Sequence, residues 1–429
     1  NPMINIENIR EIVFDSQEAR YIKVNQTEMF TNPSNGNKYG GSIFEIEAYK
    51  YAMIEPEIEN AKMALTKLES EGFELPESSN KKIVFPESIT KNFDVEIYGS
   101  DYKSIIDLDG VYHQPLVDKD VHIMYKIINK NDENDIAISS NDNRIHVYGK
   151  YENSGENEFP NVIPTIQEWH GEDGNYSILD TSKIVYNDAS LEVQANILSG
   201  YLNKLVGIEV DIEKGTNPKK GDIYLSLTNN DKAAVLGNEG YIMKVGDYVT
   251  INSTTVKGVF YGGVSIVQAL YLNSDELEIP KGIAYDYPKY EVRSIALDVA
   301  RSEIKLDYIK EITEMLPLFK VNEIVMHIND DRGDKIADTT IGSEQNIKQT
   351  KDLSAFRIEN DKNIGGHAYQ ISKADYIEYQ LEAAKYGVSV VTELDTPAHS
   401  AVFSLLPEMH DNMYDVKKIK ILDDASTDV

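Results

Sequence analysis

Residues 387–400 read GVSVVTELDTPAHS, and the predicted fold rests on this segment more than on any other. Its first half, 388–391, is apolar and rich in β-branched residues, which is typical of a fully buried parallel strand. Its second half brings together the ionisable side chains of Glu393, Asp395 and His399. Ionisable groups at the carboxyl end of a buried strand are what the active site of a β/α barrel requires. Taken alone, the stretch predicts either such a site or a strand end with solvated polar residues.

Two earlier stretches are built in the same way. Residues 292–301 (VRSIALDVAR) are apolar after their first positions, and their last positions include Asp298 and Arg301. Residues 321–328 (VNEIVMHI) are also strand-like, and Asp330 follows them closely. Because charged side chains follow each of the predicted strands, we favour a common site over independent solvated strand ends.

Two amphipathic segments separate these strands. Apolar residues three or four positions apart predict a helix over 306–319. Ser372 and Asp375 form a capping box that opens a second helix, and Gly387 is a good C-terminal cap for it. The side chains that this second helix should bury are Ile377, Leu381 and Ala384. Strands that alternate with helices in this order predict the start of a right-handed parallel β/α array.

Four motifs lie at these strand ends and in the intervening loop: LDVAR at 297–301, HINDD at 327–331, GGHAY at 365–369 and ELDTPAHS at 393–400. In this order they resemble the opening blocks of the catalytic barrel of glycoside hydrolase family 20, the family of β-N-acetylhexosaminidases and lacto-N-biosidases. The resemblance covers 290–429 and implies a partial (β/α)8 TIM barrel there. Thr392 stands where the family usually has proline, and Ala398 where many members have glycine, but the charged positions are intact.

The resemblance also implies roles for individual residues. The expected substrate-binding residues are Arg301, His367 and Glu393: Arg301 from the resemblance, His367 from its place in the loop at 364–369, and Glu393 because its position in the strand matches that of Asp395. Arg301 would grip the outer hydroxyls of the terminal N-acetylated sugar, to which its fork of donors is suited. Asp330, Asp395 and His399 would support the catalytic acid. Asp330 and His399 would form a relay in which the carboxylate fixes the tautomer of the imidazole.

Each of these roles also has a purely structural alternative. Arg301 would otherwise pair with Asp298 or Asp331, since an unpaired guanidinium at the end of a buried strand is costly. The relay would otherwise be a plain core hydrogen bond. Asp395 would otherwise only anchor the turn that follows it.

The same cluster contains residue types that metal-dependent hydrolases use as ligands, namely His327, Asp330, Asp395 and His399. A mononuclear barrel metallohydrolase usually carries His-x-His on its first strand, and 292–301 contains no histidine. We therefore expect no metal and no cofactor, and we interpret His327 as a satisfied core histidine. The acidic run around Asp132 lacks the DxDxDG spacing, so it predicts no calcium site.

The family's catalytic Asp-Glu pair ends the fourth barrel strand, which the resemblance places beyond Val429. The chain has two Asp-Glu dipeptides, at 132–133 and 275–276, and both lie upstream in polar contexts typical of surface charge. We therefore expect the chain to be inactive alone, with the missing C-terminal part of the same protein as its partner. Sheet edges left open after three barrel strands would make the isolated chain unstable.

The remaining sequence predicts modules in front of the barrel. The predicted boundaries are 1–50 for the C-terminal part of a discoidin-like β-sandwich, 51–78 for a helical connector, 79–152 for a bacterial immunoglobulin-like β-sandwich, 160–285 for a small α+β domain and 286–429 for the N-terminal part of the barrel. The α+β block resembles the domain that precedes the barrel in family 20. Its helix at 258–272 is glycine-rich near its start but lacks a P-loop pattern, so we predict close backbone packing rather than a phosphate cradle.

The chain of 429 residues carries a formal net charge of −30 and has no cysteine. Strong acidity argues against nucleic acid or anionic membranes as partners. No apolar run approaches the roughly 20 residues that span a bilayer, and the lack of cysteine excludes disulfides and thiolate metal sites. The tandem modules in front of the barrel predict a bacterial protein that is secreted or attached to the cell wall, and the expected partner is a host or mucin-type glycan.

The function that the resemblance implies is release of terminal β-linked N-acetylhexosamine or lacto-N-biose by retaining, substrate-assisted catalysis. In this chemistry the 2-acetamido oxygen of the sugar attacks C1. The alternative is a non-catalytic glycan-binding or adhesin scaffold with a degenerate barrel. The two carboxylates of the fourth strand, present or replaced, discriminate between these functions.

Overall fold

The computed structural model describes residues 30–31, 34–39, 58–140, 143–331, 354–362, 364–365, 369–396, 399–400 and 402–403. The chain divides into two compact units, Asn1–Glu59 and Asn60–Val429. In the first unit, β1 (Phe30–Thr31) pairs antiparallel with β2 (Lys38–Tyr39). Most of the predicted discoidin-like segment at 1–50 lies outside the described residues, and so does His367.

The second unit begins with a module in which a helix packs on an antiparallel sheet. Its elements are α1 (Ala61–Glu71), β3 (Lys81–Lys82), α2 (Glu87–Thr90), β4 (Phe93–Ser100), β5 (Val111–Tyr112), β6 (Lys119–Asn129), β7 (Asp132–Ile138) and β8 (Arg144–Val147). Strands β4, β7 and β8 all pair with β6. The backbone N–H of Ala61 in α1 donates a 3.0 Å hydrogen bond to the Asp135 carboxylate of β7. The predicted connector helix is therefore packed into this module, and the immunoglobulin-like assignment stays a prediction.

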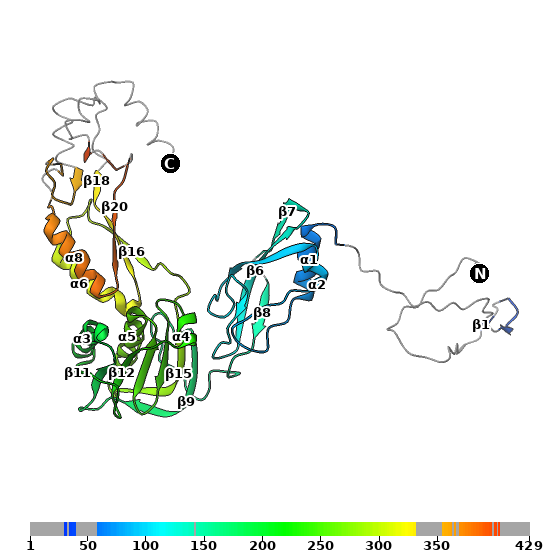
Figure 1. Ribbon diagram of the computed structural model, residues 1–429, viewed down its shortest axis with the longest axis horizontal. Coiled ribbons are helices and arrows are strands. Elements are labelled where there is room, and N and C mark those ends of the chain that lie inside the picture. The colour runs from blue at the N-terminus through cyan, green and yellow to red at the C-terminus, as the bar shows by residue number, and fades with distance from the viewer. Residues whose placement is uncertain are drawn as a thin grey trace, which may run out of the picture. The chain divides into compact units, whose positions relative to one another are not determined.

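A seven-stranded mixed sheet follows, in the order β11-β10-β12-β14-β13-β15-β9. Its strands are β9 (Glu168–Ser177), β10 (Lys183–Tyr186), β11 (Asp211–Lys214), β12 (Ile223–Leu227), β13 (Tyr241–Val245), β14 (Val249–Ser253) and β15 (Glu278–Asp286). Its helices are η1 (Ala189–Leu191), α3 (Glu192–Tyr201), η2 (Leu202–Val206), α4 (Asp231–Val235) and α5 (Val256–Leu272). Helices α3 and α5 contact each other and the sheet (Figure 1). The antiparallel pair β13 and β14 is joined by a turn that contains Gly246 and Asp247.

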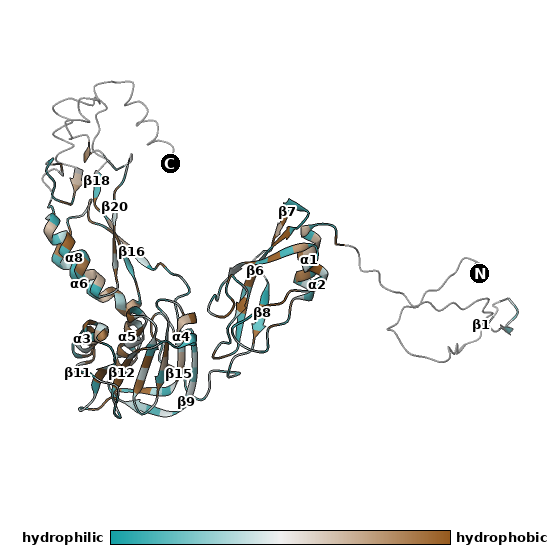
Figure 2. Cartoon of the chain, in the orientation of Figure 1, coloured by the Kyte–Doolittle hydropathy of each residue, from teal (hydrophilic) through white to brown (hydrophobic). Residues whose placement is uncertain are grey.

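Helix α5 is the hydrophobic centre of this domain and is coloured brown over much of its length in Figure 2. Thr255 caps it, accepting a 3.0 Å hydrogen bond from the backbone N–H of Gly258. A Cβ atom at Gly262 would collide with Ile251 and Tyr241 of the sheet, and one at Gly263 would collide with Leu198 of α3. The glycines therefore allow close approach of backbone to neighbouring side chains, which confirms the packing prediction.

The beginning of a parallel β/α array completes the second unit. Strands β16 (Ser294–Asp298), β17 (Glu323–His327) and β20 (Ser389–Glu393) pair in parallel in that order. Helix α6 (Leu306–Met315) with η3 (Leu316–Phe319) connects the first two strands, and α8 (Lys373–Lys385) leads into the third. Helices α6 and α8 lie side by side along the sheet (Figure 1). The predicted alternation of strands and helices is confirmed, including the Ser372 cap, whose hydroxyl accepts from the N–H of Asp375 at 3.0 Å.

A short antiparallel pair interrupts this alternation between β17 and α8. Strand β18 (Asn329–Asp331) pairs with β19 (Ser354–Phe356), so the chain beyond β17 continues as extended backbone to Asp331. Among the described residues, no helix is long and apolar enough to cross a membrane.

The buried face of α8 differs from the prediction. Ile377 and Leu381 are 58% and 66% exposed, and Ala384 is also exposed. The buried residues are Tyr376, Tyr379 and Ala383. Tyrosine buries a large ring when its hydroxyl finds a partner, and here Tyr379 bonds to Thr313 of α6 at 2.9 Å.

The third strand is less buried than predicted for 388–391. Val388 is 2% exposed, but Val391 is 39% exposed. In the part of the chain that the structure describes, β20 pairs with β17 alone. One edge of β20 is therefore without a neighbouring strand there, and its apolar side chains keep contact with solvent.

A buried ion pair joins the array to the α+β domain. Lys320, which follows η3, places its ammonium 2.6 Å from the Asp286 carboxylate of β15, and Tyr241 of β13 donates to the same carboxylate at 2.7 Å. Nearby, Glu239 accepts a 2.9 Å hydrogen bond from Asn322 and pairs with Arg293. Buried charges are tolerated only when they are paired in this way, so the two domains are fixed against each other at the entrances of β16 and β17.

Replacing Gly262 by alanine should destabilise the protein by about 1–3 kcal/mol, because the new methyl group overpacks the α5–sheet interface. Alanine favours helix by up to about 1 kcal/mol over glycine, so the steric cost must exceed this gain. The free energy of unfolding in urea, followed by circular dichroism, measures the change.

Gly200 provides the matched control, because it lies in α3 and a Cβ atom added to it would meet nothing within 4 Å. Gly200→Ala should leave the unfolding free energy unchanged or raise it by up to about 1 kcal/mol. Equal effects of the two substitutions would contradict the packing role of Gly262.

Candidate active site

Parallel pairing in register brings the last residues of three strands into one row. Asp298 of β16 is the register partner of His327 of β17, and His327 is the register partner of Glu393 of β20. Carboxyl ends of parallel strands share one edge of a sheet, which is where α/β folds place their sites. The charged residues predicted from separate motifs therefore meet at this edge.

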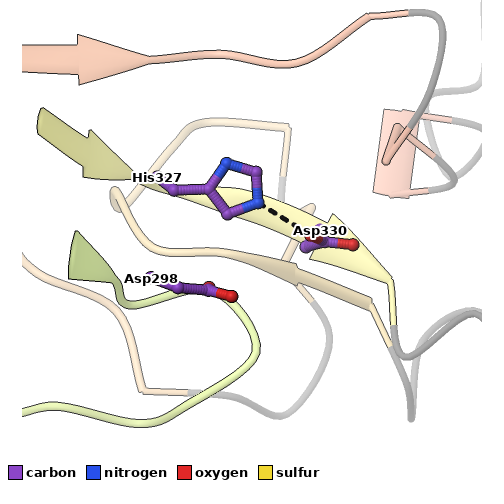
Figure 3. A group of neighbouring side chains, drawn as sticks. All are labelled: Asp298, His327 and Asp330. Carbon is purple, nitrogen blue, oxygen red and sulfur yellow. Dashed lines mark hydrogen bonds and ion pairs between the residues drawn. The ribbon is translucent and has the colours of Figure 1, made fainter. Parts of the chain in front are cut away.

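His327 is the centre of this row. Its side chain is buried, its Nε2 lies 2.7 Å from Oδ2 of Asp330, and its Nδ1 lies 2.7 Å from Oε1 of Glu393. Figure 3 shows the imidazole between strand β17 and the Asp330 carboxylate, with Asp298 on the neighbouring strand end. Carboxylates on both nitrogens are matched by the doubly protonated imidazolium, which donates to each.

Two opposing effects set the pKa of His327. Burial lowers this pKa, but the hydrogen bonds to Asp330 and Glu393 outweigh burial, so the pKa lies above its usual value. The interpretation of His327 as a buried and satisfied histidine is confirmed. What the sequence did not reveal is that its partners are the carboxylates of the candidate site.

Asp330 is the most enclosed carboxylate of the cluster. Its side chain is 1% exposed and contacts three groups: His327 as above, the Nη2 of Arg301 at 2.6 Å, and the Nδ1 of His399 at 3.1 Å. A buried carboxylate needs such donors to remain ionised. The structure thus brings together Arg301, Asp330 and His399, which the sequence placed in one site.

Arg301 lies in a turn rather than at the end of a strand, because β16 ends at Asp298. Asp298 holds this turn by accepting from the backbone N–H of Arg301 at 2.9 Å and pairing with its Nη1 at 2.8 Å. The Arg301 side chain is still 48% exposed, so the expectation that it closes a buried strand is wrong. The ion pair with Asp298 that was weighed as an alternative is present, beside the contact of the same guanidinium with Asp330.

The third strand supplies the remaining groups. Glu393 is half-buried against His327, and the Asp395 carboxylate lies 3.9 Å from the Nδ1 of His327. His399 has a backbone φ of +54°, in the left-handed region, and its side chain is 44% exposed. The roles predicted for Glu393, Asp395 and His399 stay predictions, and His367 lies outside the described residues.

Two groups of side chains in this cluster lie close enough to hold a metal ion: Asp298, His327 and Asp330, and His327, Glu393 and Asp395. Both groups depend on the single imidazole of His327. Each of its nitrogens is already at hydrogen-bond distance from a carboxylate. The donor set therefore fits a hydrogen-bonded ion cluster better than a metal centre.

Two further polar residues support the site, and sequence periodicity carried no signal for them. Arg357, 3% exposed, donates to the backbone carbonyls of Ala300 at 2.8 Å and Tyr369 at 2.9 Å, so it braces the turn that carries Arg301. Asn329 is fully buried beside Asp330. By contrast, the Asp-Glu dipeptides at 132–133 and 275–276 are exposed, as predicted for surface charge.

Two protein-family models match this chain. "Glycosyl hydrolase family 20, domain 2" matches residues 159–287, and "Glycosyl hydrolase family 20, catalytic domain" matches residues 290–425. Together they cover more than half of the chain, in the order that the α+β domain and the β/α array have in the structure. The chain belongs to glycoside hydrolase family 20.

Curated relatives carry related names. A lacto-N-biosidase of Bifidobacterium bifidum is 26% identical over 57% of this chain and 19% of its own length. A beta-hexosaminidase of Porphyromonas gingivalis is 24% identical over 58% of this chain and 32% of its own length. Among solved structures, the family 20 β-N-acetylhexosaminidase of Streptomyces coelicolor A3(2) is 25% identical, covers 57% of this chain and 48% of its own, and has a TM-score of 0.45. The chain thus spans less than half the length of these relatives.

Replacing His327 by glutamine should flatten the pH dependence of stability above about pH 6.5. The native pKa of His327 is raised, so the folded protein binds this proton more tightly than the unfolded chain does. The resulting stability is present below the unfolded pKa of about 6.5 and is lost as the pH rises through the native pKa. Urea unfolding of both proteins between about pH 5 and 9 measures the difference.

His113 provides a control, because its pKa is shifted in the opposite direction to that of His327. Burial lowers its pKa despite the nearby Asp107, so the stability linked to His113 is lost as the pH falls below about 6.5. His113→Gln should therefore change the acidic side of the curve and not the alkaline side. If His327→Gln and the unsubstituted protein gave parallel curves above neutral pH, the assignment of an imidazolium at His327 would be wrong.

Proposed function

We propose that the protein containing this chain is a glycosidase that removes terminal β-linked N-acetylhexosamine, or lacto-N-biose, from glycans. The observation that carries the proposal is the contact of the buried Asp330 carboxylate with both Arg301 and His399. This contact joins the Arg301 guanidinium, which is suited to binding sugar hydroxyls, to the His399 imidazole, which is suited to proton transfer. The three groups lie at the carboxyl ends of the parallel strands. Family membership and the names of the relatives support the same class of reaction.

The proposed mechanism is retaining and substrate-assisted. The 2-acetamido oxygen of the sugar attacks C1, the bond from C1 to the leaving oxygen breaks, and a glutamic acid protonates that oxygen. Water then opens the oxazoline-like intermediate and restores the acetamide. The glutamic acid and the aspartate that orients the acetamide are expected at the end of the fourth barrel strand.

Within this mechanism the described residues position the terminal sugar and the catalytic acid. The half-exposed guanidinium of Arg301 would donate to adjacent hydroxyls of the terminal sugar, while Asp330 neutralises its charge. Asp330 would also hold His399 in the tautomer that bonds the acid. Such preorganised groups act without reorganising during the reaction.

The setting of the enzyme is also a proposal. The net charge of −30 favours a neutral glycan over a polyanion as substrate. We propose a bacterial protein that is secreted or held on the cell wall, where modules in front of the barrel would bring it to host or mucin-type glycans.

The test uses the full-length protein and p-nitrophenyl glycosides. We expect release of nitrophenol from the β-linked 2-acetamido glucoside, galactoside or lacto-N-bioside, and none from the β-glucoside, which lacks the acetamide. Hydrolysis of the β-glucoside at a similar rate would contradict substrate assistance. Binding of these sugars without hydrolysis would instead identify a glycan-binding scaffold.

Replacing Arg301 by lysine should lower kcat/KM by roughly 10- to 100-fold, because lysine keeps the charge near Asp330 but loses the two-donor fork to the sugar. Steady-state kinetics on the best nitrophenyl glycoside measure the loss. Arg144→Lys is the matched control, since Arg144 pairs with the exposed Asp120 in another module. Similar kinetics for both variants would contradict the assignment of Arg301 to the sugar site.

A further inference from the structure

Asn329 makes three hydrogen bonds to backbone on the far side of the site. It is fully buried in β18, directly before Asp330. Its side-chain oxygen accepts from the N–H of Asp395 at 3.0 Å. Its Nδ2 donates to the carbonyl of Asp395 at 3.1 Å and to the carbonyl of His399 at 2.9 Å. One amide side chain therefore pairs with both backbone groups of Asp395 and also reaches His399.

The backbone that Asn329 holds has left the sheet. Strand β20 ends at Glu393, so Asp395 and His399 have no ladder of strand hydrogen bonds to fix them. His399 also has a φ of +54°, a left-handed conformation that is uncommon for residues other than glycine and that contacts with the surroundings can stabilise. The bond from Asn329 to the His399 carbonyl is part of those surroundings.

We infer that Asn329 is the positioning residue that sets His399 against Asp330 and Arg301. The His399 Nδ1 lies 3.1 Å from Oδ1 of Asp330 and 3.3 Å from Nη2 of Arg301. Asn329 and Asp330 are consecutive residues of β18. This one strand therefore holds the backbone of His399 through Asn329 and its imidazole ring through Asp330. This inference rests on the proposed function, in which His399 supports the catalytic acid.

Asn329→Asp is the most specific test, because it replaces the side-chain amide nitrogen by an oxygen atom and keeps the shape of the side chain. The N–H of Asp395 still has an acceptor, but a carboxylate oxygen now faces the carbonyls of Asp395 and His399. When ionised it repels both, and when protonated it donates to one of them. The titratable and charged groups around this position are Asp330, Asp395, Glu393, His327, His399 and Arg301.

In the full-length enzyme, Asn329→Asp should lower kcat by about 100-fold near neutral pH, the size of effect that a displacement of about 1 Å can have. KM should change little, since Arg301 keeps its place. Activity should recover partly as the pH falls and the new carboxyl group is protonated. Asn329→Ser, which cannot ionise, should lose activity without this recovery, and it carries the test if the aspartate variant does not fold.

Asn187 is a matched control from the α+β domain. Its side chain also bonds both backbone groups of one residue: it accepts from the N–H of Leu227 and donates to the Leu227 carbonyl, each at 2.9 Å. Asn187→Asp should affect stability while leaving the pH profile of kcat as in the unsubstituted enzyme. An unaltered kcat profile for Asn329→Asp, or the same altered profile for Asn187→Asp, would overturn the inference.

A second readout separates this inference from the proposed function. The imidazole signals of His399 are followed by NMR of 15N-histidine-labelled full-length protein, assigned with His399→Gln. Asn329→Asp should shift these signals and the pKa they report, whether or not any glycoside is hydrolysed. Failure of hydrolysis by the unsubstituted protein would overturn the proposed function, whereas unchanged His399 signals in the variant would overturn the role of Asn329.

Discussion

The register between three parallel strands is the constraint on which the site depends. Because β16, β17 and β20 pair without a shift, Asp298, His327 and Glu393 become neighbours although nearly a hundred positions separate the first from the last. A slip of one residue would turn every side chain of a strand to its other face. Burial of Ile324 and Met326 in the core beside His327 holds β17 against such a slip.

Charge balance then determines how the cluster is arranged. Asp330 is almost fully enclosed, and a carboxylate in that position is stable only with several donors around it. Arg301, His327 and His399 supply them from three different segments. The strand register thus brings the strand ends together, and the need to pair the buried Asp330 then determines which side chains of the neighbouring segments turn toward it.

The sequence predicted the elements of this region well, because apolar periodicity and the Ser372 cap are local signals. It also placed Arg301, Asp330 and His399 in one site, since all three follow predicted strands. It did not predict the contacts of His327 and Asn329, because a single buried polar residue has no periodicity and its partners lie on other segments. The face of α8 was predicted wrongly, because Ile377 and Leu381 are exposed whereas Tyr376 and Tyr379 are buried.

The buried pair of Lys320 and Asp286 has a consequence for how such proteins diversify. The two family models meet at residues 287 and 290, which invites a cut or an exchange of domains there. However, Lys320 and Arg293 on one side have their partners Asp286 and Glu239 on the other. A recombination at this point would leave a buried charge unpaired on each half, so we expect the α+β domain and the barrel to tolerate exchange only as one unit.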